Sequence, residues 1–210
     1  MKPKFNVKQL TLLAMLVAVL LLMSFTPLGY LNIGPLAITF NVIPVAIAAL
    51  ALGPAGGLIA GSVFGLTSFL QCLGIGGLSS LGSILFGINP FFAILLCFIP
   101  RMLLDGFLLG YIFRIVGRLN RPAACFVIGF CAAFFNTLGF MSLLLLLFGR
   151  TDYMQGLING QNILIFACSF VGLNAIFEML SSTLITGAVG SVLCRARLVP
   201  EAANDKDKED

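Results

Sequence analysis

The stretch NPFFAILLCFIPRMLLDGFLLGYIF, from Asn89 to Phe113, decides the class of this protein. It is long and apolar enough to cross a lipid bilayer as one helix, yet Arg101 and Asp105 lie near its middle. Each charge at the centre of a membrane helix costs about 2.5–3.5 kcal/mol on insertion scales. Because such side chains normally face the interior of a bundle or a wet cavity, the stretch predicts a functional site within a membrane protein.

The composition of the whole chain agrees with this class. Of the 210 residues, 60% are hydrophobic and 10% are charged, and the mean hydropathy is +1.10. A soluble domain of this length could not bury so much apolar surface. Histidine is absent and no G-x-x-x-x-G-K-S/T loop occurs, which excludes Ser–His nucleophile pairs, zinc sites built on histidine and a P-loop ATPase. The six scattered cysteines form no CxxC pair and are expected to be small buried thiols.

Six apolar segments predict an all-α membrane protein, a bundle of six transmembrane helices. Each segment reaches or approaches the roughly 17–25 residues that a span needs, and the expected bounds are 8–25, 36–53, 55–72, 90–117, 122–149 and 162–194. The bundle forms one domain over residues 1–199, and residues 200–210 are expected to be a disordered, charged cytoplasmic tail. The N-terminus mimics a signal peptide, but no convincing A-x-A cleavage site follows it, so we interpret it as an uncleaved first helix.

Positive charges set the expected orientation. Arg150 lies on one side of the predicted bundle, whereas the remaining loop and terminal lysines and arginines lie on the other: Lys2, Lys4, Lys8, Arg114, Arg118, Arg121, Arg195, Arg197, Lys206 and Lys208. Cytoplasmic loops carry an excess of Lys and Arg, so both termini are expected to face the cytoplasm.

Polar residues of the last three spans are expected at one depth. Counted from the outer ends of their spans, Arg101, Asn136 and Asn174 lie about 17 Å in, at roughly 1.5 Å per residue. Asp105 and Glu178 follow one turn deeper, on the faces of Arg101 and Asn174, because each pair is four residues apart. This layer predicts a pocket open to the outside. The alternative is that Arg101 only pairs with Asp105 or Glu178 and locks the helices together.

Glycine and proline predict local geometry around this layer. Residues 52–57 are typical of a tight turn on the inner side. Pro100 lacks a backbone N–H, so it frees the carbonyl of Leu96 and is expected to kink the fourth span. Small residues every fourth position favour close packing of the third span inside the bundle; they are Gly57, Gly61 and Gly65.

The outer loops and the first helix carry further signals. Residues 26–38 and 73–89 are rich in glycine yet apolar, so they either fold back as a lid or rest on lipid headgroups. Ala14 and Ala18 are four residues apart in an otherwise bulky first helix. They make a shallow groove for a second helix, from this bundle or from a partner.

At this point the sequence resembles the substrate-binding S components of energy-coupling factor (ECF) vitamin transporters, in the branch for pantothenate and riboflavin. The alanine pair contributes weakly, whereas TPLGYLNIGPLAITFNVIPVAIAALALGPAGGLIAGSVFGLTSF, residues 26–69, is more specific. Pro100-Arg101, Asn136-Thr137 and the Asn174–Glu178 spacing also resemble that branch. The resemblance covers roughly residues 8–195.

The resemblance implies a small bundle in a prokaryotic plasma membrane that binds a vitamin on the outer side. It docks through Ala14 and Ala18 onto a membrane coupling subunit, which carries two ATPase subunits, and topples in the membrane to deliver the ligand. The chain itself then needs no cofactor, metal or enzymatic activity, because the partner subunits use the ATP. The loop over residues 26–39 acts as the gate, with Tyr30 and Asn32 as its polar members.

The polar residues suggest which vitamin is bound. Arg101 suits a carboxylate through charge-assisted hydrogen bonds, and no tryptophan is present to stack on a large flat ring. Pantothenate is therefore the first expectation and riboflavin the second. The expected substrate site also includes Asn136, Asn174 and Glu178, which suit hydroxyls and amides. Asp105, Thr39 and Asn41 complete the set of expected substrate contacts.

Another class of transporter stays open. A self-sufficient, ion-coupled secondary carrier or channel would use Asp105 or Glu178 for proton or sodium coupling. The absence of an obvious inverted repeat argues mildly against it. An intramembrane aspartyl protease would need two membrane aspartates, and Asp105 alone qualifies.

Overall fold

The computed structural model describes residues 6–26, 29–33, 36–75, 79–118, 120–196 and 198–199. Within these ranges the chain is helical, as predicted, apart from one short hairpin. Five helical runs in the described residues are long and apolar enough to cross a membrane. The elements in chain order are α1 (Val7–Ser24), β1 (Tyr30–Ile33), β2 (Leu36–Thr39), α2 (Val42–Cys72), α3 (Ser80–Ile88), α4 (Pro90–Ile99), the π-helix η1 (Pro100–Leu108), α5 (Leu109–Val116), α6 (Arg121–Phe148), α7 (Asp152–Ile158) and α8 (Ile163–Arg195).

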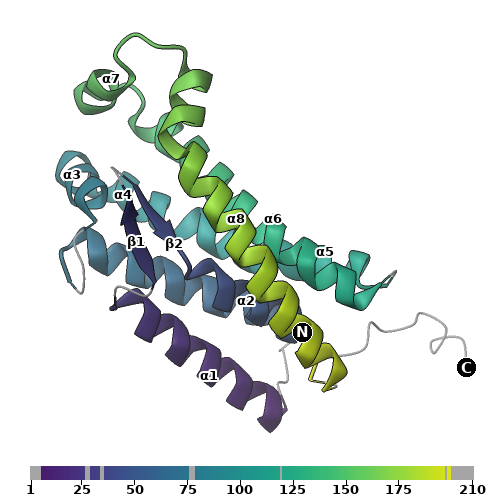
Figure 1. Cartoon of the computed structure of the whole chain (residues 1–210). Helices are drawn as coiled ribbons and strands as arrows, with labels where there is room; N and C mark the ends of the chain where they lie inside the picture. Colours follow the sequence, from purple (N-terminus) through teal and green to yellow (C-terminus); the bar gives the residue numbers. More distant parts are fainter. Residues whose placement is uncertain are drawn as a thin grey trace, which may run out of the picture.

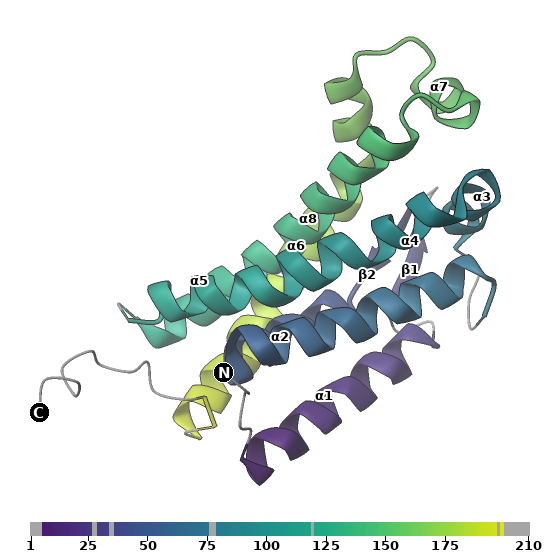
Figure 2. The same cartoon turned by 180° about the vertical axis from the view of Figure 1, so that it is seen from behind.

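The long helices lie side by side in a layered bundle. Helix α2 packs between α1 and the continuous run of α4, η1 and α5, and α6 lies on the other side of that run (Figures 1 and 2). Helix α8 crosses the bundle beside α6 and also touches α2 and β2. Helices α3 and α7 lie at one end of the bundle, whereas α1 begins and α8 ends at the opposite end.

Helix α2 turns back on itself at Gly53. The φ of Gly53 is 71°, a left-handed value that a residue with a side chain rarely adopts, and Pro54 follows it. A Cβ built on Gly57 would lie 2.8 Å from the Cβ of Ala49, although eight residues separate them along the chain. Two helical segments, 42–52 and 54–72, therefore pack against each other, and the predicted tight turn is confirmed.

The expected span over residues 36–53 is wrong in its first part. Residues 36–39 form β2, which pairs antiparallel with β1 from Tyr30↔Thr39 to Ile33↔Leu36, and the helix begins at Val42. An apolar run of this length fits a strand or a buried helix equally well, and contacts elsewhere decide. The all-α expectation is corrected by this hairpin, which occupies much of the expected outer loop.

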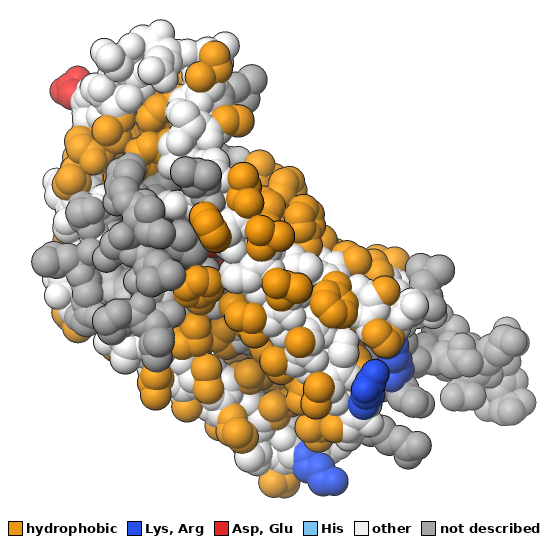
Figure 3. All heavy atoms as spheres, in the orientation of Figure 1, with side chains coloured by type: hydrophobic (Ala, Val, Ile, Leu, Met, Phe, Trp, Pro, Cys, Tyr) orange, Lys and Arg blue, Asp and Glu red, His pale blue; other side chains and the backbone are white. Residues whose placement is uncertain are grey.

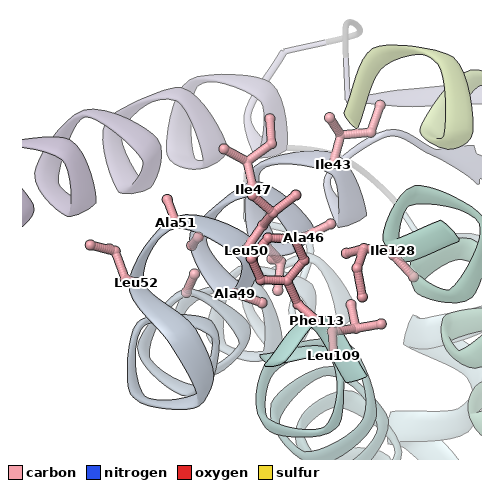
Figure 4. Packing of buried hydrophobic residues seen from close by; sticks show 14 of the residues in the cluster. Ile43, Ala46, Ile47, Ala49, Leu50, Ala51, Leu52, Leu109, Phe113 and Ile128 are labelled. Carbon is pink, nitrogen blue, oxygen red and sulfur yellow. The ribbon is translucent and has the colours of Figure 1, made fainter. Parts of the chain in front are cut away.

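Every residue from Val42 to Leu52 is buried, which makes this segment the centre of the core. Figure 4 shows Ile43, Ala46, Ile47, Leu50, Leu109, Phe113 and Ile128 packed together. A second cluster of buried apolar residues lies toward the opposite end of the bundle, among α3, α4, α6, α7 and α8. Along the run from α4 to α5, along α6 and along α8, the polar residues Arg101, Asp105, Asn136 and Glu178 lie between residues of the two clusters.

Charges and apolar side chains divide the surface as a bilayer requires. Figure 3 shows the visible Lys and Arg side chains gathered at one end, and apolar side chains over most of the remaining described surface. Exposed Lys8, Arg114, Arg118 and Arg195 lie at ends of α1, α5 and α8, and Arg150 follows the end of α6. A large exposed apolar surface is expected where lipid, rather than water, surrounds a protein.

Candidate functional site

Pro100 opens the π-helix and determines where Arg101 points. Proline supplies no N–H, so the carbonyl of Leu96 lacks its helical donor. Arg101 Nη1 donates to that carbonyl at 3.3 Å and to the carbonyl of Cys97 at 3.1 Å. The guanidinium therefore folds back toward the start of α4, in the direction that Cβ atoms take along a helix.

Two aromatic rings hold the same guanidinium. Cζ of Arg101 lies 4.8 Å from the ring centroid of Phe64 on α2 and 5.9 Å from that of Phe140 on α6. Cation–π contacts of this kind are stronger where water is excluded. Among the described residues, the buried Nε of Arg101 has no hydrogen-bond partner. The side chain is thus held in place while one of its donors stays available.

Close backbone packing fixes the position of η1. A Cβ built on Gly61 would lie 2.2 Å from the carbonyl oxygen of Arg101, and one on Gly57 would lie 2.2 Å from that of Gly106. Helix α2 can approach η1 this closely because its facing residues are glycines. The glycine ridge is therefore an internal packing face, which confirms the predicted packing role.

Asp105 is completely buried one turn further along η1. Neither of its carboxylate oxygens has a hydrogen-bond partner within the described part of the chain. The charges of Arg101 and Glu178 both act on it through space. Within the described residues, Arg101 and Asp105 form no direct ion pair, because the guanidinium points toward Leu96, away from Asp105.

Glu178 on α8 is also buried, but both of its oxygens are hydrogen-bonded. Oε1 accepts the backbone N–H of Thr39 at 2.6 Å, and Oε2 accepts the hydroxyl of Thr137 at 3.3 Å. The side chain of Asn136 lies beside the same carboxylate. One acid thus joins β2, α6 and α8.

The two asparagines of the predicted layer are buried: Asn136 is 7% exposed and Asn174 is 8% exposed. Within the described ranges, Oδ1 of Asn136 and the buried Oγ1 of Thr39 have no hydrogen-bond partner. We call Arg101, Asp105, Asn136 and Glu178 the central layer. Whether these residues and Asn174 share one ligand stays a prediction.

Asn41 belongs to a different group of polar residues, which we call the junction cluster: Ser24, Asn41, Thr67 and Gln71. Asn41 Nδ2 donates to Ser24 Oγ at 3.1 Å, Ser24 Oγ donates to Thr67 Oγ1 at 3.1 Å, and Gln71 Nε2 donates to the carbonyl of Ser24 at 2.6 Å. This network ties the end of α1 to both parts of α2. The predicted contact of Asn41 with substrate stays a prediction.

The remaining predicted residues lie at the periphery. Tyr30 and Asn32 are in β1, but their side chains fall outside the described residues. Ala14 and Ala18 are exposed on α1, whose buried residues are Leu13, Leu20 and Ser24. The groove of alanines therefore does not pack against the described part of the bundle, and its docking role stays a prediction.

Sequence reasoning missed three features of the structure. Phe64 lies three residues after Gly61, so its helical position on the glycine ridge could have indicated that it faces Arg101. The contact between Glu178 and the backbone of Thr39 has no local signal, because 139 residues separate them. Cys72 and Cys97, expected to be unremarkable thiols, have sulfur atoms 3.6 Å apart.

Comparison with known proteins identifies the family. Residues 8–190 match the family model described as "ECF transporter, substrate-specific component". The chain is also similar to the pantothenate transporter PanT of Leuconostoc mesenteroides subsp. mesenteroides, with 33% identity over 197 residues, 89% of this chain and 92% of that relative. The family and the relative are transporters rather than enzymes, and the apolar helices make this chain a multi-pass protein of a prokaryotic plasma membrane. The chain thus belongs to the family of substrate-specific components of ECF vitamin-uptake transporters.

Proposed function

We propose that this chain binds pantothenate in its central layer, as the vitamin-binding step of ECF-type uptake. The observation that carries the proposal is a set of buried polar atoms that lack partners among the described residues: Arg101 Nε, Asn136 Oδ1 and Thr39 Oγ1. Buried polar groups are normally hydrogen-bonded, so unpaired ones indicate a missing ligand. Pantothenate has a carboxylate, two hydroxyls and an amide, which complement a guanidinium, an amide and a hydroxyl.

The proposed orientation places the central layer below an extracellular opening. The six crossings are α1, the two segments of α2, the run from α4 to α5, α6 and α8. The segment 42–52 spans only roughly 16 Å at 1.5 Å per residue, so the hairpin before it completes that crossing. Exposed Lys8, Arg114 and Arg195 at one end support cytoplasmic termini, because positive charges concentrate on that side.

Docking is assigned to the exposed face of Ala14 and Ala18. Two alanines four residues apart allow a helix of the coupling subunit to approach α1 closely. Their exposure supports this assignment, since the other small-residue ridge, on α2, is already occupied by η1. The two ATPase subunits then act through the coupling subunit.

A binding measurement tests the ligand. Purified full-length protein, titrated calorimetrically with pantothenate, should show saturable binding that riboflavin does not compete for. Mass spectrometry of small molecules that co-purify with the protein should find the same compound. Absence of binding, or displacement by riboflavin at equal concentration, would reject pantothenate. Uptake by the protein alone in liposomes, driven by an ion gradient, would instead support a secondary carrier.

Substitution of the alanines tests docking. Replacing Ala14 and Ala18 together with leucine should abolish uptake by the assembled transporter and leave pantothenate affinity unchanged, because neither residue lies near the central layer. Ala188→Leu provides the control, since Ala188 is also exposed but lies on α8. Loss of uptake in the Ala188→Leu control, or normal uptake in the double variant, would contradict the assignment.

A further inference from the structure

Glu178 differs from the other members of the central layer in one respect. Both of its carboxylate oxygens are occupied by the protein, by the N–H of Thr39 and the hydroxyl of Thr137. By contrast, both oxygens of Asp105 and Oδ1 of Asn136 have no partner among the described residues. A ligand would have to displace existing hydrogen bonds to reach Glu178, whereas the unpaired atoms are available without such a loss.

The hydrogen bond that the N–H of Thr39 donates to Glu178 lies on the side of β2 that faces away from β1. Thr39 is the last residue of β2 and pairs with Tyr30. The next N–H along the chain, that of Phe40, donates back toward β1, to the carbonyl of Gly29 at 3.0 Å. Successive N–H groups of an extended chain point to opposite sides, so the N–H of Thr39 is the one that faces α8.

An isolated two-stranded hairpin is marginally stable and depends on its attachment to the rest of a fold. Strand β2 lies against α8, and Glu178 supplies a buried, charge-assisted hydrogen bond at that contact. The same carboxylate is fixed on its other side by Thr137 of α6. The hairpin is therefore attached to α8, and the carboxylate that holds it is itself fixed to α6.

We propose that Glu178 is a positioning residue that fastens the β1–β2 hairpin to α8 and so sets how readily the site beneath it opens. The link to ligand entry rests on the proposed function, whereas the attachment itself does not. We therefore assign Glu178 the role of supporting the hairpin, in place of the expected contact with the ligand. Arg101 and Asn136 remain the candidates for direct contact.

Hydrogen–deuterium exchange of the ligand-free, full-length protein tests the attachment. In Glu178→Ala the amides of β1 and β2 should exchange about tenfold faster or more, because a hydrogen bond to a charged group is lost. Amides of α2 should exchange as in the wild type, which shows that the bundle is folded. Glu178→Gln keeps an acceptor for Thr39 and a donor for Thr137, so it should restore most of the protection.

Substitutions at Thr39 test the same bond from its other partner. Thr39→Pro removes the N–H and should speed exchange of the hairpin as Glu178→Ala does. Thr39→Val keeps the N–H and loses only the hydroxyl, so exchange should match the wild type. Combining Thr39→Pro with Glu178→Ala should add little to either change, because both remove one interaction. Additive effects, or unchanged exchange in Glu178→Ala, would overturn the proposal.

Binding kinetics separate this proposal from the proposed ligand. With the hairpin released, both association and dissociation of pantothenate should be faster, and Kd should change less than the dissociation rate. Faster dissociation alone, with normal hairpin exchange, would make Glu178 a ligand contact and overturn the attachment. If pantothenate fails to bind the wild type while exchange responds as expected, the proposed ligand is wrong and the attachment stands.

Discussion

The junction cluster and the central layer are both buried and polar, but they are satisfied differently. Ser24, Asn41, Thr67 and Gln71 of the junction cluster are uncharged and linked through hydrogen bonds to one another, and Oδ1 of Asn41 is the one of their atoms that lacks a partner among the described residues. The central layer holds three charged residues and, within the described residues, several atoms without a partner. Neutral groups that are hydrogen-bonded to one another stabilise a fold, whereas buried polar or ionisable groups without a partner lower its stability.

This difference separates residues that hold the structure from residues that serve a ligand. Three hydrogen bonds of the junction cluster close on Ser24 at the end of α1, next to the hairpin. The central layer offers an unpaired donor, Arg101 Nε, to an anionic group and an unpaired acceptor, Asn136 Oδ1, to a hydroxyl, so an anionic, hydroxylated molecule would gain from binding there. Substitutions in the two regions should therefore change different measured quantities.

The largest expected effect on ligand affinity comes from Gly61→Ala. The new Cβ would meet the carbonyl oxygen of Arg101 at 2.2 Å, so α2 and η1 must separate and Arg101 must shift. Overpacking of this kind costs about 1–3 kcal/mol. Because Arg101 is displaced in the folded protein, we expect pantothenate affinity, measured by calorimetry, to fall about tenfold to a hundredfold, which corresponds to about 1.4–2.8 kcal/mol.

Gly172→Ala is the control for that change. A Cβ on Gly172, in α8, meets no described atom within 4 Å, so the affinity should stay at the wild-type value. Wild-type affinity in Gly61→Ala as well would mean that the close approach of α2 to η1 does not position Arg101.

A smaller effect is expected from Arg101→Ala. Loss of the guanidinium should weaken pantothenate by about 1.4 kcal/mol, a tenfold change in Kd. Arg101→Lys keeps the charge but loses the planar fork, so it should recover only part of the affinity. Equal affinities in all three proteins would assign Arg101 to the fold and remove the central layer from the proposed site.

The smallest effect on affinity is expected from Gln71→Leu in the junction cluster. This change leaves the buried carbonyl of Ser24 without its donor, which costs about 1–3 kcal/mol of folding free energy. The thermal unfolding midpoint should fall by several degrees, while Kd for pantothenate stays within about twofold. A large loss of affinity at an unchanged midpoint would reverse the roles of the two regions.

Much of this fold follows from local sequence. Hydropathy and span length place α1, α6 and α8 within a few residues, and Gly53-Pro54 marks the turn in α2. The freed carbonyl of Leu96 also follows from Pro100 alone. Such features depend on neighbours within a few residues, which a sequence shows directly.

The hairpin and the π-helix depend on distant contacts instead. Residues 36–39 are apolar enough for a helix, and their attachment to Glu178 lies 139 residues away. The π-helix contacts glycines of α2. The four-residue spacing of these glycines indicates that another helix approaches closely, but it does not indicate which helix. The unpaired state of Asp105 was equally hidden, because four-residue spacing predicts an ion pair with Arg101.

The π-helix between Pro100 and Leu108 bears on how this protein tolerates changes in length. A π-helical turn encloses one residue more than an α-helical turn, so removing a single residue from it could restore regular α geometry. Because the wide turn absorbs the extra residue, the residues after such a deletion would keep their orientation relative to α4. The close approaches of Gly106 and Gly110 to α2 would then be kept, so a one-residue deletion here should be less harmful than one in the middle of α6, which turns everything after it by about 100°.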